Sequence, residues 1–372
     1  MIDDDELGAW LRLLLVPGIG REGARRLLAG FGSPQAVVQA SEQALATVAG
    51  PRLAAEILTE PADLGTSLAA VRRWLGGDDG RQVLTLGDPG YPRILLESPD
   101  PPLLLYVQGD PAHLAGPAIA VVGSRKPTPQ GLDNARRFAQ AFGEAGHVVV
   151  SGLALGVDGA AHEGALASGA PTVAVVGTGL DRVYPRRHLE LARRIAQQGA
   201  LVSEFLPGTP PLAENFPQRN RIIAGLSLGT VVVEAALQSG SLITARLANE
   251  AGREVFAVPG SIHAEQSRGC HALIREGARL VESAAEVLDE LRQPPLRLAP
   301  ARASALAPAP VAEGDRPDPL LDALGHDPVT LDSLQARTGW PTAELLARLL
   351  DLELEGRVAR LPGGLFQRSP RA

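Results

Sequence analysis

Residues 118–291 alternate short apolar runs with helical patterns, and this alternation constrains the fold more than any other feature of the chain. The runs are AIAVVG (118–123), HVVVSG (147–152), TVAVVG (172–177), ALVSEF (200–205), TVVVEA (230–235) and EVFAVPG (254–260). Continuous valine-rich runs are typical of strands buried on both faces. The helical patterns that separate them cover 131–145, 157–168, 188–198 and 241–252. This alternation predicts an α/β fold with a doubly wound parallel sheet.

The rest of the chain divides around this central segment. Residues 1–80 are predicted to form a helical domain, and turn-rich sequences near 76–92 separate it from a central domain at 90–292. Residues 293–319 hold seven prolines and no apolar periodicity, which predicts an extended linker. The last segment, 320–372, shows three helical patterns and then two short strands, which is the layout of a winged-helix-like domain.

Composition limits where the chain works and what it binds. It has one cysteine, which excludes a disulfide framework and a cysteine-based zinc site and fits a reducing cytosol. The acidic start, MIDDDELGAW, does not fit a signal peptide, and no apolar run approaches membrane-spanning length. We therefore expect a cytoplasmic protein. The net charge is −7, which argues against sequence-blind coating of nucleic acid by the whole surface, but residues 119–230 carry a small basic excess.

The segments just after the predicted strands are suited to a phosphate-bearing ligand. Doubly wound sheets bind ligands beyond the carboxyl ends of their strands. Those segments are GSRKPT (123–128), SGLALG (151–156), GTGLDR (177–182) and EAALQSGS (234–241). Small residues allow close backbone approach, and hydroxyl and N–H groups suit phosphate oxygens. The first predicted strand ends in VVGSRKP and not in G-x-G-x-x-G, and the chain has no P-loop sequence, so we expect no dinucleotide and no ATP cofactor.

Two basic clusters favour an open polyanion. Arg125 and Lys126 directly follow the first predicted strand, and Lys126 is the only lysine beside 34 arginines. The second cluster, FPQRNRIIAGLS (216–227), places Phe216 beside Arg219 and Arg221. An aromatic next to cations suits base stacking on single-stranded nucleic acid. The alternative is that Phe216 belongs to the core and that the arginines pair with nearby acids.

The turn VPGIG (16–20), with the helical pattern that follows it, resembles a helix-hairpin-helix element. Such a turn offers backbone N–H groups to a phosphate, which makes Gly18, Gly20 and Arg21 a second candidate contact. The alternative is a plain helical turn that serves packing alone.

Catalytic and metal-binding interpretations have weaker support. Asp158 and His162 are four residues apart on a predicted helix, where a surface pair or a capping role is the alternative to a catalytic dyad. The Cys270-His271 pair lacks further ligands for a metal. The enzyme alternative is a nucleotide phosphoribohydrolase with a related sheet, in which Glu234 would be the acid. We expect no catalytic residue, no metal and no cofactor.

Several motifs, in order, resemble the DNA-processing protein A family, whose members are called DprA or Smf. They are VVGSRKPT, SGLALGVDGAAH, GTGLDRVYPRRH, SEFLPGTPP, FPQRNRIIAGLS, VVVEAALQSGSLITARLANEAGREVFAVPGSI and GCHALIREGA. The resemblance implies an extended Rossmann-like domain that binds single-stranded DNA. It also implies a flanking SAM-like or helix-hairpin-helix-like domain and a C-terminal winged-helix-like domain.

The resemblance further implies a non-enzymatic recombination mediator that protects single strands and helps to load the recombinase RecA during natural transformation in competent cells. Homodimers are implied, and we place their interface within 254–290. Single-strand-binding protein and double-stranded DNA are further candidate partners. The residues expected to bind DNA are Gly123, Ser124, Arg125, Lys126, Ser151, Gly152, Phe216, Arg219, Asn220, Arg221, Ser239, Gly240, Ser241 and Thr244.

Two regions depart from what a DNA-binding family member would lead us to expect. Many members carry a lysine shortly before the phenylalanine of the second cluster, whereas residues 208–215 hold no cation and one acid, Glu214. The helix predicted at 341–354 occupies the place of a recognition helix but is mainly acidic. We therefore expect the C-terminal domain to contact protein or to regulate the chain itself, with duplex DNA as the alternative.

Overall fold

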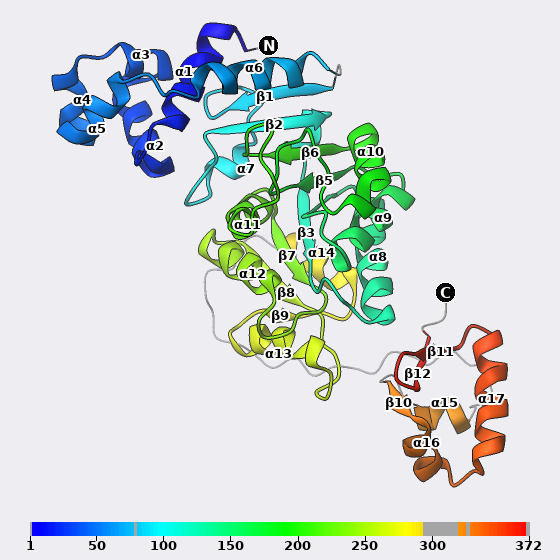
Figure 1. The fold of residues 1–372 in the computed structure, drawn as a ribbon. Coiled ribbons are helices and arrows are strands. Elements are labelled where there is room, and N and C mark those ends of the chain that lie inside the picture. Colours follow the sequence, from blue (N-terminus) through cyan, green and yellow to red (C-terminus); the bar gives the residue numbers. More distant parts are fainter. Residues whose placement is uncertain (1, 78–79, 293–318, 325–327, 370–372) are drawn as a thin grey trace. The chain divides into compact units, whose positions relative to one another are not determined.

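The computed structural model describes residues 2–77, 80–292, 319–324 and 328–369 (Figure 1). The chain forms two compact units, Met1–Gln293 and Pro294–Ala372. The proline-rich linker expected at 293–319 lies, up to residue 318, outside the described residues.

The larger unit is built on a nine-stranded sheet with the order β1-β2-β6-β5-β4-β3-β7-β8-β9. Its strands are β1 (Arg81–Thr85), β2 (Leu104–Gly109), β3 (Ala118–Val122), β4 (Val148–Ser151), β5 (Thr172–Val175), β6 (Ala200–Ser203), β7 (Gly229–Val232), β8 (Glu254–Ala257) and β9 (Arg279–Leu280). Every neighbouring pair from β6 through β3 to β9 is parallel. The six strands expected from the apolar runs are all present, so the predicted doubly wound parallel sheet is confirmed.

The order of the strands creates a switch point at β3. The chain builds outward from β3 to β6 on one side and then returns to place β7 on the other side of β3. The connections that leave β3 and β7 therefore diverge, and a crevice forms at the carboxyl ends of these two strands. Any ligand site of this sheet is expected there.

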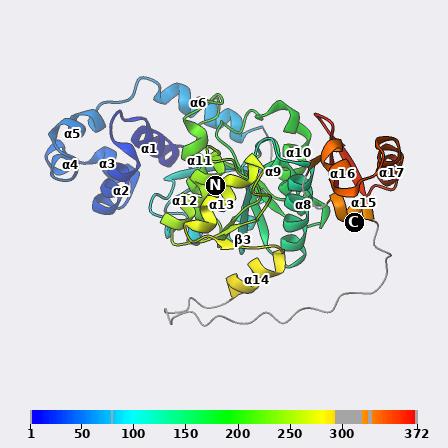
Figure 2. The same cartoon turned by 90° about the horizontal axis from the view of Figure 1, so that it is seen from below.

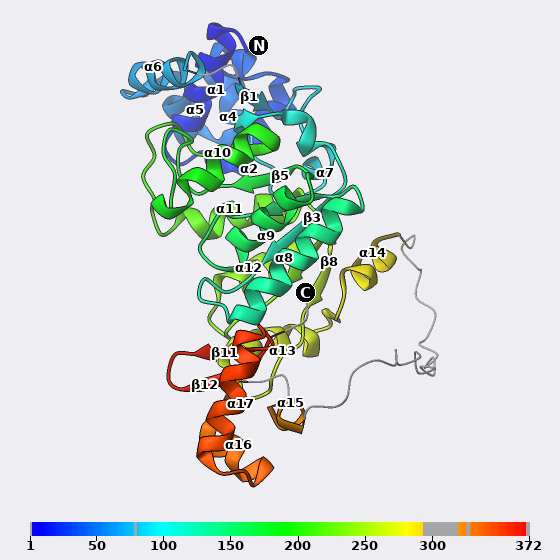
Figure 3. The ribbon, with the colours of Figure 1, turned by 90° about the vertical axis from the view of Figure 1, so that its right-hand side faces the viewer.

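Helices cover both faces of the sheet (Figures 1, 2 and 3). On one face Ile119 and Val121 of β3 pack against α8, α9 and α14, and on the other face Ala120 and Val122 share a core with α11, α12 and α13. Successive side chains of a strand point to opposite faces, so both sets are apolar because both faces are covered. These helices are α8 (Pro129–Glu144), α9 (Val157–Ala167), α11 (Asn215–Gly225), α12 (Gly240–Glu250), α13 (Arg268–Arg275) and α14 (Ala284–Arg292). The short α7 (Arg93–Leu96) and α10 (Leu189–Gln198) complete the central region.

Two features of this unit were not expected from the sequence. Strands β1 and β2 add an antiparallel edge, with β2 paired to β6. Helix α11 forms where only a basic cluster was recognised. Its buried residues include both isoleucines and polar side chains such as Asn215 and Arg219, so no amphipathic pattern marks it.

Residues 4–75 form six helices, as the helical pattern of this segment predicts. They are α1 (Asp4–Leu15), α2 (Gly20–Phe31), α3 (Pro34–Gln39), α4 (Glu42–Ala49), α5 (Pro51–Leu58) and α6 (Leu64–Leu75). The side chain of Asp3 caps α1 by accepting a hydrogen bond from the backbone N–H of Glu6 at 2.8 Å. Trp74 of α6 meets Tyr106 of β2 edge to face, with ring centroids 5.7 Å apart, and this contact joins the helices to the edge of the sheet.

The smaller unit has the winged-helix layout that the sequence predicts. It contains α15 (Pro319–Leu324), β10 (Val329–Thr330), α16 (Leu331–Thr338), α17 (Thr342–Leu354), β11 (Val358–Leu361) and β12 (Leu365–Arg368), with the strand order β10-β12-β11. Helix α17 buries Leu345, Leu349 and Leu352 in the core of this unit. In the described part of the chain, no helix combines the length and the apolarity that crossing a bilayer requires.

Candidate nucleic-acid interface

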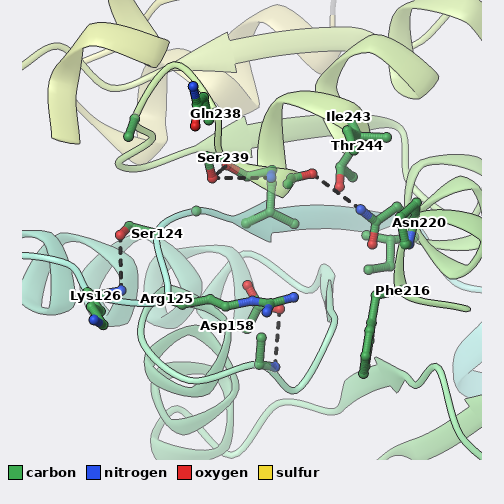
Figure 4. Close-up of a pocket in the computed structure, with 18 of the residues that line it drawn as sticks. Ser124, Arg125, Lys126, Asp158, Phe216, Asn220, Gln238, Ser239, Ile243 and Thr244 are labelled. Atoms are coloured by element: carbon green, nitrogen blue, oxygen red, sulfur yellow. Dashed lines mark hydrogen bonds between the residues drawn. The ribbon is translucent and has the colours of Figure 1, made fainter. Parts of the chain in front are cut away.

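A pocket of about 990 Å³ opens at the switch point, beyond the ends of β3 and β7 (Figure 4). Its walls come from the loop after β3, the first turns of α11, and the loop that leads into α12. Most of the residues expected from the sequence line it. They are Gly123, Ser124, Arg125, Lys126, Phe216, Arg219, Asn220, Ser239, Gly240, Ser241 and Thr244.

The loop after β3 holds two cations at the pocket. A Cβ atom on Gly123 would lie 2.8 Å from the Cγ2 atom of Val157 and 2.9 Å from the backbone oxygen of Glu234, so this close approach requires glycine. The loop is fixed further because the backbone N–H of Val157 donates to the carbonyl of Ser124 at 3.1 Å. Arg125 and Lys126 are both exposed, and neither forms an ion pair with a described residue. Their charges are therefore available to a ligand.

Phe216 places an aromatic ring beside one of these cations. The side chain is half-buried at the start of α11 and lines the pocket. The Cζ atom of Arg125 lies 5.7 Å from the centre of its ring, within the range of a cation–π contact, and Figure 4 shows Arg125 reaching across the pocket towards it. Phe216 is thus neither a core residue nor a fully exposed one, and its ring faces the same space as the Arg125 guanidinium.

The start of α12 forms the opposite wall. Ser239 caps this helix by accepting a hydrogen bond from the backbone N–H of Ser241 at 3.3 Å, and the two hydroxyl oxygens lie 2.7 Å apart. The side-chain amide of Asn220 donates to the carbonyl of Gly240 at 3.3 Å and links α11 to this turn. Helix N-termini that carry free N–H groups and hydroxyls attract anions, so this wall suits a phosphate.

Arg219 lines the pocket but serves the fold. Its side chain is 4% exposed, and its guanidinium donates to the carbonyl of Gly152 at 2.6 Å and to that of Val175. Burial lowers the pKa of Arg219 to about 10, although Asp158 opposes this effect. A guanidinium that bonds the ends of β4 and β5 from within the protein is a poor phosphate ligand.

Arg221 is not part of the pocket lining. Its guanidinium pairs with the carboxylate of Glu204 and lies 3.1 Å from the carboxylate of Asp100. The expectation that it faces the phosphate alongside Arg219 is corrected here, because α11 turns this side chain towards two acids. The alternative noted for this cluster, that the arginines pair within the protein, describes Arg221 correctly.

Ser151 and Gly152 also lie outside the pocket lining. The hydroxyl of the fully buried Ser151 donates to the carbonyl of Val121 at 2.7 Å. A Cβ atom on Gly152 would lie 2.5 Å from the Nη1 atom of Arg219. Gly152 is therefore required because it leaves room for a buried guanidinium, and we assign neither residue a direct contact with a ligand.

In the turn at residues 16–20, only backbone groups are available to a ligand. Gly18 and Gly20 are exposed and adopt positive φ angles of 81° and 60°. Arg21, by contrast, pairs with Asp100 at 2.8 Å and donates to the side-chain oxygen of Gln218 at 3.2 Å. Its charge is used to hold α2 against α11, so a phosphate contact by this turn would rest on the glycine N–H groups and remains a prediction.

The candidate catalytic groups are engaged in structural contacts. Asp158 accepts hydrogen bonds from the backbone N–H groups of Gly152 at 3.1 Å and Ala154 at 3.3 Å, in the loop that leads into α9, so it holds this loop and does not cap the helix. The Nδ1 atom of His162 lies 2.8 Å from the hydroxyl of Thr172, and burial lowers the pKa of His162 to about 3. No hydrogen bond joins the two side chains in the described structure, so they do not form a dyad.

Glu234 lies outside the pocket lining as well. Its carboxylate accepts hydrogen bonds from the backbone N–H of Thr128 at 2.9 Å and from the Thr128 hydroxyl at 2.6 Å. Burial raises its pKa, and these hydrogen bonds oppose the rise. Among the described residues there is also no cluster of three or more His, Cys, Asp or Glu side chains that could hold a metal ion.

Several residues that line the pocket were not among those predicted to bind DNA, and three of them are notable for their side chains. Tyr184, Gln238 and Arg268 all line it. Tyr184 stands in GTGLDRVYPRRH, far in sequence from the other pocket residues, and Arg268 begins α13. Only the three-dimensional arrangement of the loops brings them to the switch point. Glu214, the acid that stands where many relatives have a lysine, is exposed but does not line the pocket.

Comparison with known proteins identifies the family. The model of DNA recombination-mediator protein A matches residues 82–292, and the model of the DprA winged helix domain matches residues 303–364. Protein Smf of Escherichia coli is 45% identical over 276 residues, which are 74% of each chain. The DNA processing protein DprA of Streptococcus pneumoniae is 49% identical over 203 residues, covering 55% of this chain and 72% of the relative.

Solved structures agree with this assignment. The X-ray structure of DprA from Streptococcus pneumoniae matches with a TM-score of 0.66 and 37% identity, over 78% of this chain and 98% of that one. A structure of DprA from Helicobacter pylori, whose description concerns its single-stranded DNA binding mode, matches with a TM-score of 0.52 and 32% identity over 56% of this chain and 95% of that one. The chain therefore belongs to the DNA recombination-mediator protein A family, the DprA/Smf proteins.

Proposed function

We propose that this protein binds single-stranded DNA in the pocket at the switch point. The observation that carries the proposal is that two exposed cations without ion-pair partners among the described residues, Arg125 and Lys126, share one pocket with the aromatic ring of Phe216. Cations neutralise phosphates, whereas an aromatic ring accepts any unpaired base. A pocket that offers both matches a nucleic acid whose bases are not already paired.

The other walls support a phosphate backbone in the same place. The N–H groups and hydroxyls at the start of α12 face Arg125 across the pocket, so a phosphate between them would receive hydrogen bonds from one side and a cation from the other. The proposed DNA contacts are therefore Ser124, Arg125, Lys126, Phe216, Asn220, Ser239, Gly240, Ser241 and Thr244.

The hydrolase alternative is disfavoured by the position of its acid. Glu234 is hydrogen-bonded to Thr128 and does not line the pocket. An acid that cannot reach the bound ligand cannot protonate a leaving base. We accordingly propose binding without catalysis, and we expect no base release from nucleoside monophosphates, with the same result for Glu234→Gln.

Membership of the DprA/Smf family extends the proposal to recombination. We propose that the protein acts in the cytoplasm as a homodimer, protects single strands that enter during natural transformation, and helps to load RecA onto strands covered by single-strand-binding protein. Two pockets on one dimer would raise the avidity for a single strand. The supporting experiment measures RecA filament assembly on covered single strands, which the protein should accelerate and an Arg125→Glu/Lys126→Glu variant should not.

For the smaller unit we propose contact with protein. Helix α17 exposes Leu346, Leu350 and Leu354 together with acidic side chains that include Asp351 and Glu353. Acids repel phosphate, and exposed leucines gain nothing from a DNA backbone. A chain that ends at Gln293 should therefore keep nearly the whole single-strand affinity of the full chain, and a large loss would favour a direct DNA contact.

The central test is a salt-titrated binding assay with the full chain on single and double strands. Arg125→Glu/Lys126→Glu should weaken single-strand binding roughly tenfold or more, because two charge-assisted contacts become repulsive. Log affinity should fall with log salt by about 0.7 for each phosphate contact, so the slope of the variant should be shallower. The matched control is Arg193→Glu/Arg194→Glu, which makes the same charge change at exposed sites on α10 outside the pocket.

The control separates a specific pocket from a general charge effect. If both double variants weaken binding equally, the loss reflects net charge alone and the pocket proposal fails. Full affinity in Arg125→Glu/Lys126→Glu would also overturn it.

A further inference from the structure

Tyr184 is unusual among the aromatic residues of this chain. The sequence holds seven Phe, three Tyr and three Trp, and all of them are described. Tyr184, with 48% exposure, is the only exposed one; the others are buried or half-buried. An exposed ring forfeits the free energy of burial, and a base that stacks on the ring would recover part of it. Its location therefore matters.

Tyr184 stands at the rim of the pocket, next to Phe216. The two ring centroids are 5.7 Å apart, and the ring planes differ by 38°. Phe216 thus has the Arg125 guanidinium and the Tyr184 ring as neighbours at similar distances. The two aromatic rings therefore lie next to each other in the wall of the pocket.

The loop that carries Tyr184 is held in place by hydrogen bonds. The side chain of Asp181 accepts from the backbone N–H of Gly208 at 2.6 Å, and the backbone N–H of Gly179 donates to the carbonyl of Thr209 at 3.1 Å. On the other side of Tyr184, the Nδ1 atom of His188 lies 2.9 Å from the carbonyl of Leu153. A ring presented by a fixed loop loses little conformational entropy when a ligand stacks on it.

Cations follow the ring directly in the chain. Arg186 and Arg187 begin a short 3-10 helix two residues after Tyr184, and both side chains are exposed. Neither pairs with an acid among the described residues, unlike Arg182, which lies 3.2 Å from the carboxylate of Asp181. A strand that leaves the pocket past Tyr184 would meet these two charges.

We propose that Tyr184 is a second stacking platform, which holds the base next to the one on Phe216, and that Arg186 and Arg187 neutralise the phosphates beyond it. This inference rests on the proposed single-strand binding. The two ring centroids are 5.7 Å apart, so bases stacked on them would lie further apart than the rise of about 3.4 Å per nucleotide in a B-DNA strand. A single strand can adopt such spacing, whereas a duplex would have to unstack. The aromatic pair would therefore select single strands over duplex DNA.

The proposal predicts a covalent signature. An oligonucleotide of deoxythymidines with 5-iodo-deoxyuridine at one position should crosslink to a stacked aromatic ring under ultraviolet light. Mass spectrometry of wild-type complexes should identify Tyr184 and Phe216 as the crosslinked residues, with the iodinated base at adjacent positions for the two sites. In Tyr184→Leu only the crosslink at Phe216 should remain.

Affinity provides an independent measurement. Tyr184→Ala should weaken single-strand binding roughly 5- to 150-fold, the range that the loss of one base–aromatic stack gives. Its salt slope should stay unchanged because no charge is removed, whereas Arg186→Glu/Arg187→Glu should flatten the slope. Tyr184→Phe should bind like wild type, since the ring is kept. Leu189→Ala is the matched control: it removes a similarly exposed apolar side chain, 45% exposed, from the start of α10 outside the pocket lining.

The outcomes separate this inference from the proposed function. If wild type binds single strands and Arg125→Glu/Lys126→Glu does not, but Tyr184→Ala keeps full affinity and no crosslink forms at Tyr184, the second platform is wrong and the pocket stands. If wild type shows no single-strand binding, the proposed function itself fails. If Tyr184→Ala lowers both the affinity and the urea midpoint, the affinity loss reflects a damaged fold. The second platform is then supported if wild type crosslinks at Tyr184 and Tyr184→Phe binds like wild type, and it is wrong if no crosslink forms there.

Discussion

Two pairs of cations lie within the same region of the larger unit but differ in exposure and in their partners. Arg125 and Lys126, on the loop after β3, are exposed and pair with no described acid. Arg219 and Arg221, on α11, are almost wholly enclosed, with Arg219 bonded to backbone carbonyls and Arg221 to the acids Glu204 and Asp100. Residue type is nearly the same in the two pairs, so the difference lies in which acceptors the fold places around each charge.

The two pairs differ in how much free energy each charge must recover from fixed partners. A buried guanidinium loses its hydration and must recover that free energy from fixed acceptors, which then hold it in one place. An exposed cation keeps its hydration and can exchange water for phosphate at little cost. The α11 arginines are thus held by the protein itself, whereas the charges of the loop cations are left available for the proposed DNA ligand.

The largest expected effect is on stability and comes from replacing the buried Arg219. Arg219→Gln should lower the free energy of unfolding by about 3–5 kcal/mol, because it leaves Asp158 buried without its neighbouring positive charge and two strand-end carbonyls without a donor. Urea unfolding followed by circular dichroism measures this. Arg194→Gln, at an exposed position on α10, should change stability by less than about 0.5 kcal/mol. Equal effects for the two substitutions would contradict the supporting role of Arg219.

A smaller effect, with a defined pH dependence, is expected at Asp100. Burial alone would raise the pKa of this carboxyl, but Arg221, Arg25 and Arg21 together hold it below its ordinary value of 3.8. Because the folded pKa lies below the unfolded one, the stabilisation is fully present above pH 3.8 and is lost as the pH falls through the folded pKa. Asp100→Asn should cost about 1–3 kcal/mol at neutral pH.

The test of this pH dependence compares urea midpoints of wild type and Asp100→Asn at neutral pH and at values stepped down through 3.8. The gap between the two proteins should narrow below that pH, because the wild-type carboxyl becomes protonated there. A gap of constant width would show that the arginine cluster does not depend on the charge of Asp100. The cluster would then contribute through packing alone.

The sequence predicted the sheet and the position of the pocket well, and for a physical reason. Valine-rich runs can be buried on both faces only within a covered parallel sheet, and such a sheet binds at its switch point. The role of each arginine could not be predicted in the same way. Arg219 and Arg221 differ from Arg125 through contacts with Gly152, Val175, Glu204 and Asp100, which lie far from them in sequence.

Helix α11 and Tyr184 were missed for related reasons. The helix mixes buried polar and apolar side chains, so no 3.6-residue pattern appears. Tyr184 reaches the pocket from a loop between β5 and α10, and spacing along the chain cannot show that it neighbours Phe216.

Replacing the exposed pair, Arg125 and Lys126, should affect DNA binding and leave stability nearly unchanged, whereas replacing Arg219 should lower stability. Arg125→Glu/Lys126→Glu should change the free energy of unfolding by no more than about 1 kcal/mol, because both side chains are exposed, neither forms an ion pair with a described residue, and only the cation–π contact of Arg125 with Phe216 is lost. The same variant should lose single-strand affinity. Urea unfolding and salt-titrated binding on one protein preparation measure both quantities. A variant that loses stability and affinity together would remove the distinction between the two pairs.

The smallest expected effect concerns the only lysine of the chain. A lysine among 34 arginines suggests the hypothesis that a compact ammonium fits where a planar guanidinium cannot. The structure places the Lys126 side chain in an exposed position, with its backbone N–H bonded to the Ser124 hydroxyl at 3.0 Å, so a guanidinium has room there. Lys126→Arg should therefore keep single-strand affinity within about twofold and keep the salt slope, since the charge is unchanged. A loss beyond tenfold would restore the steric argument and would mean that bound DNA closes around this residue more tightly than the free pocket does.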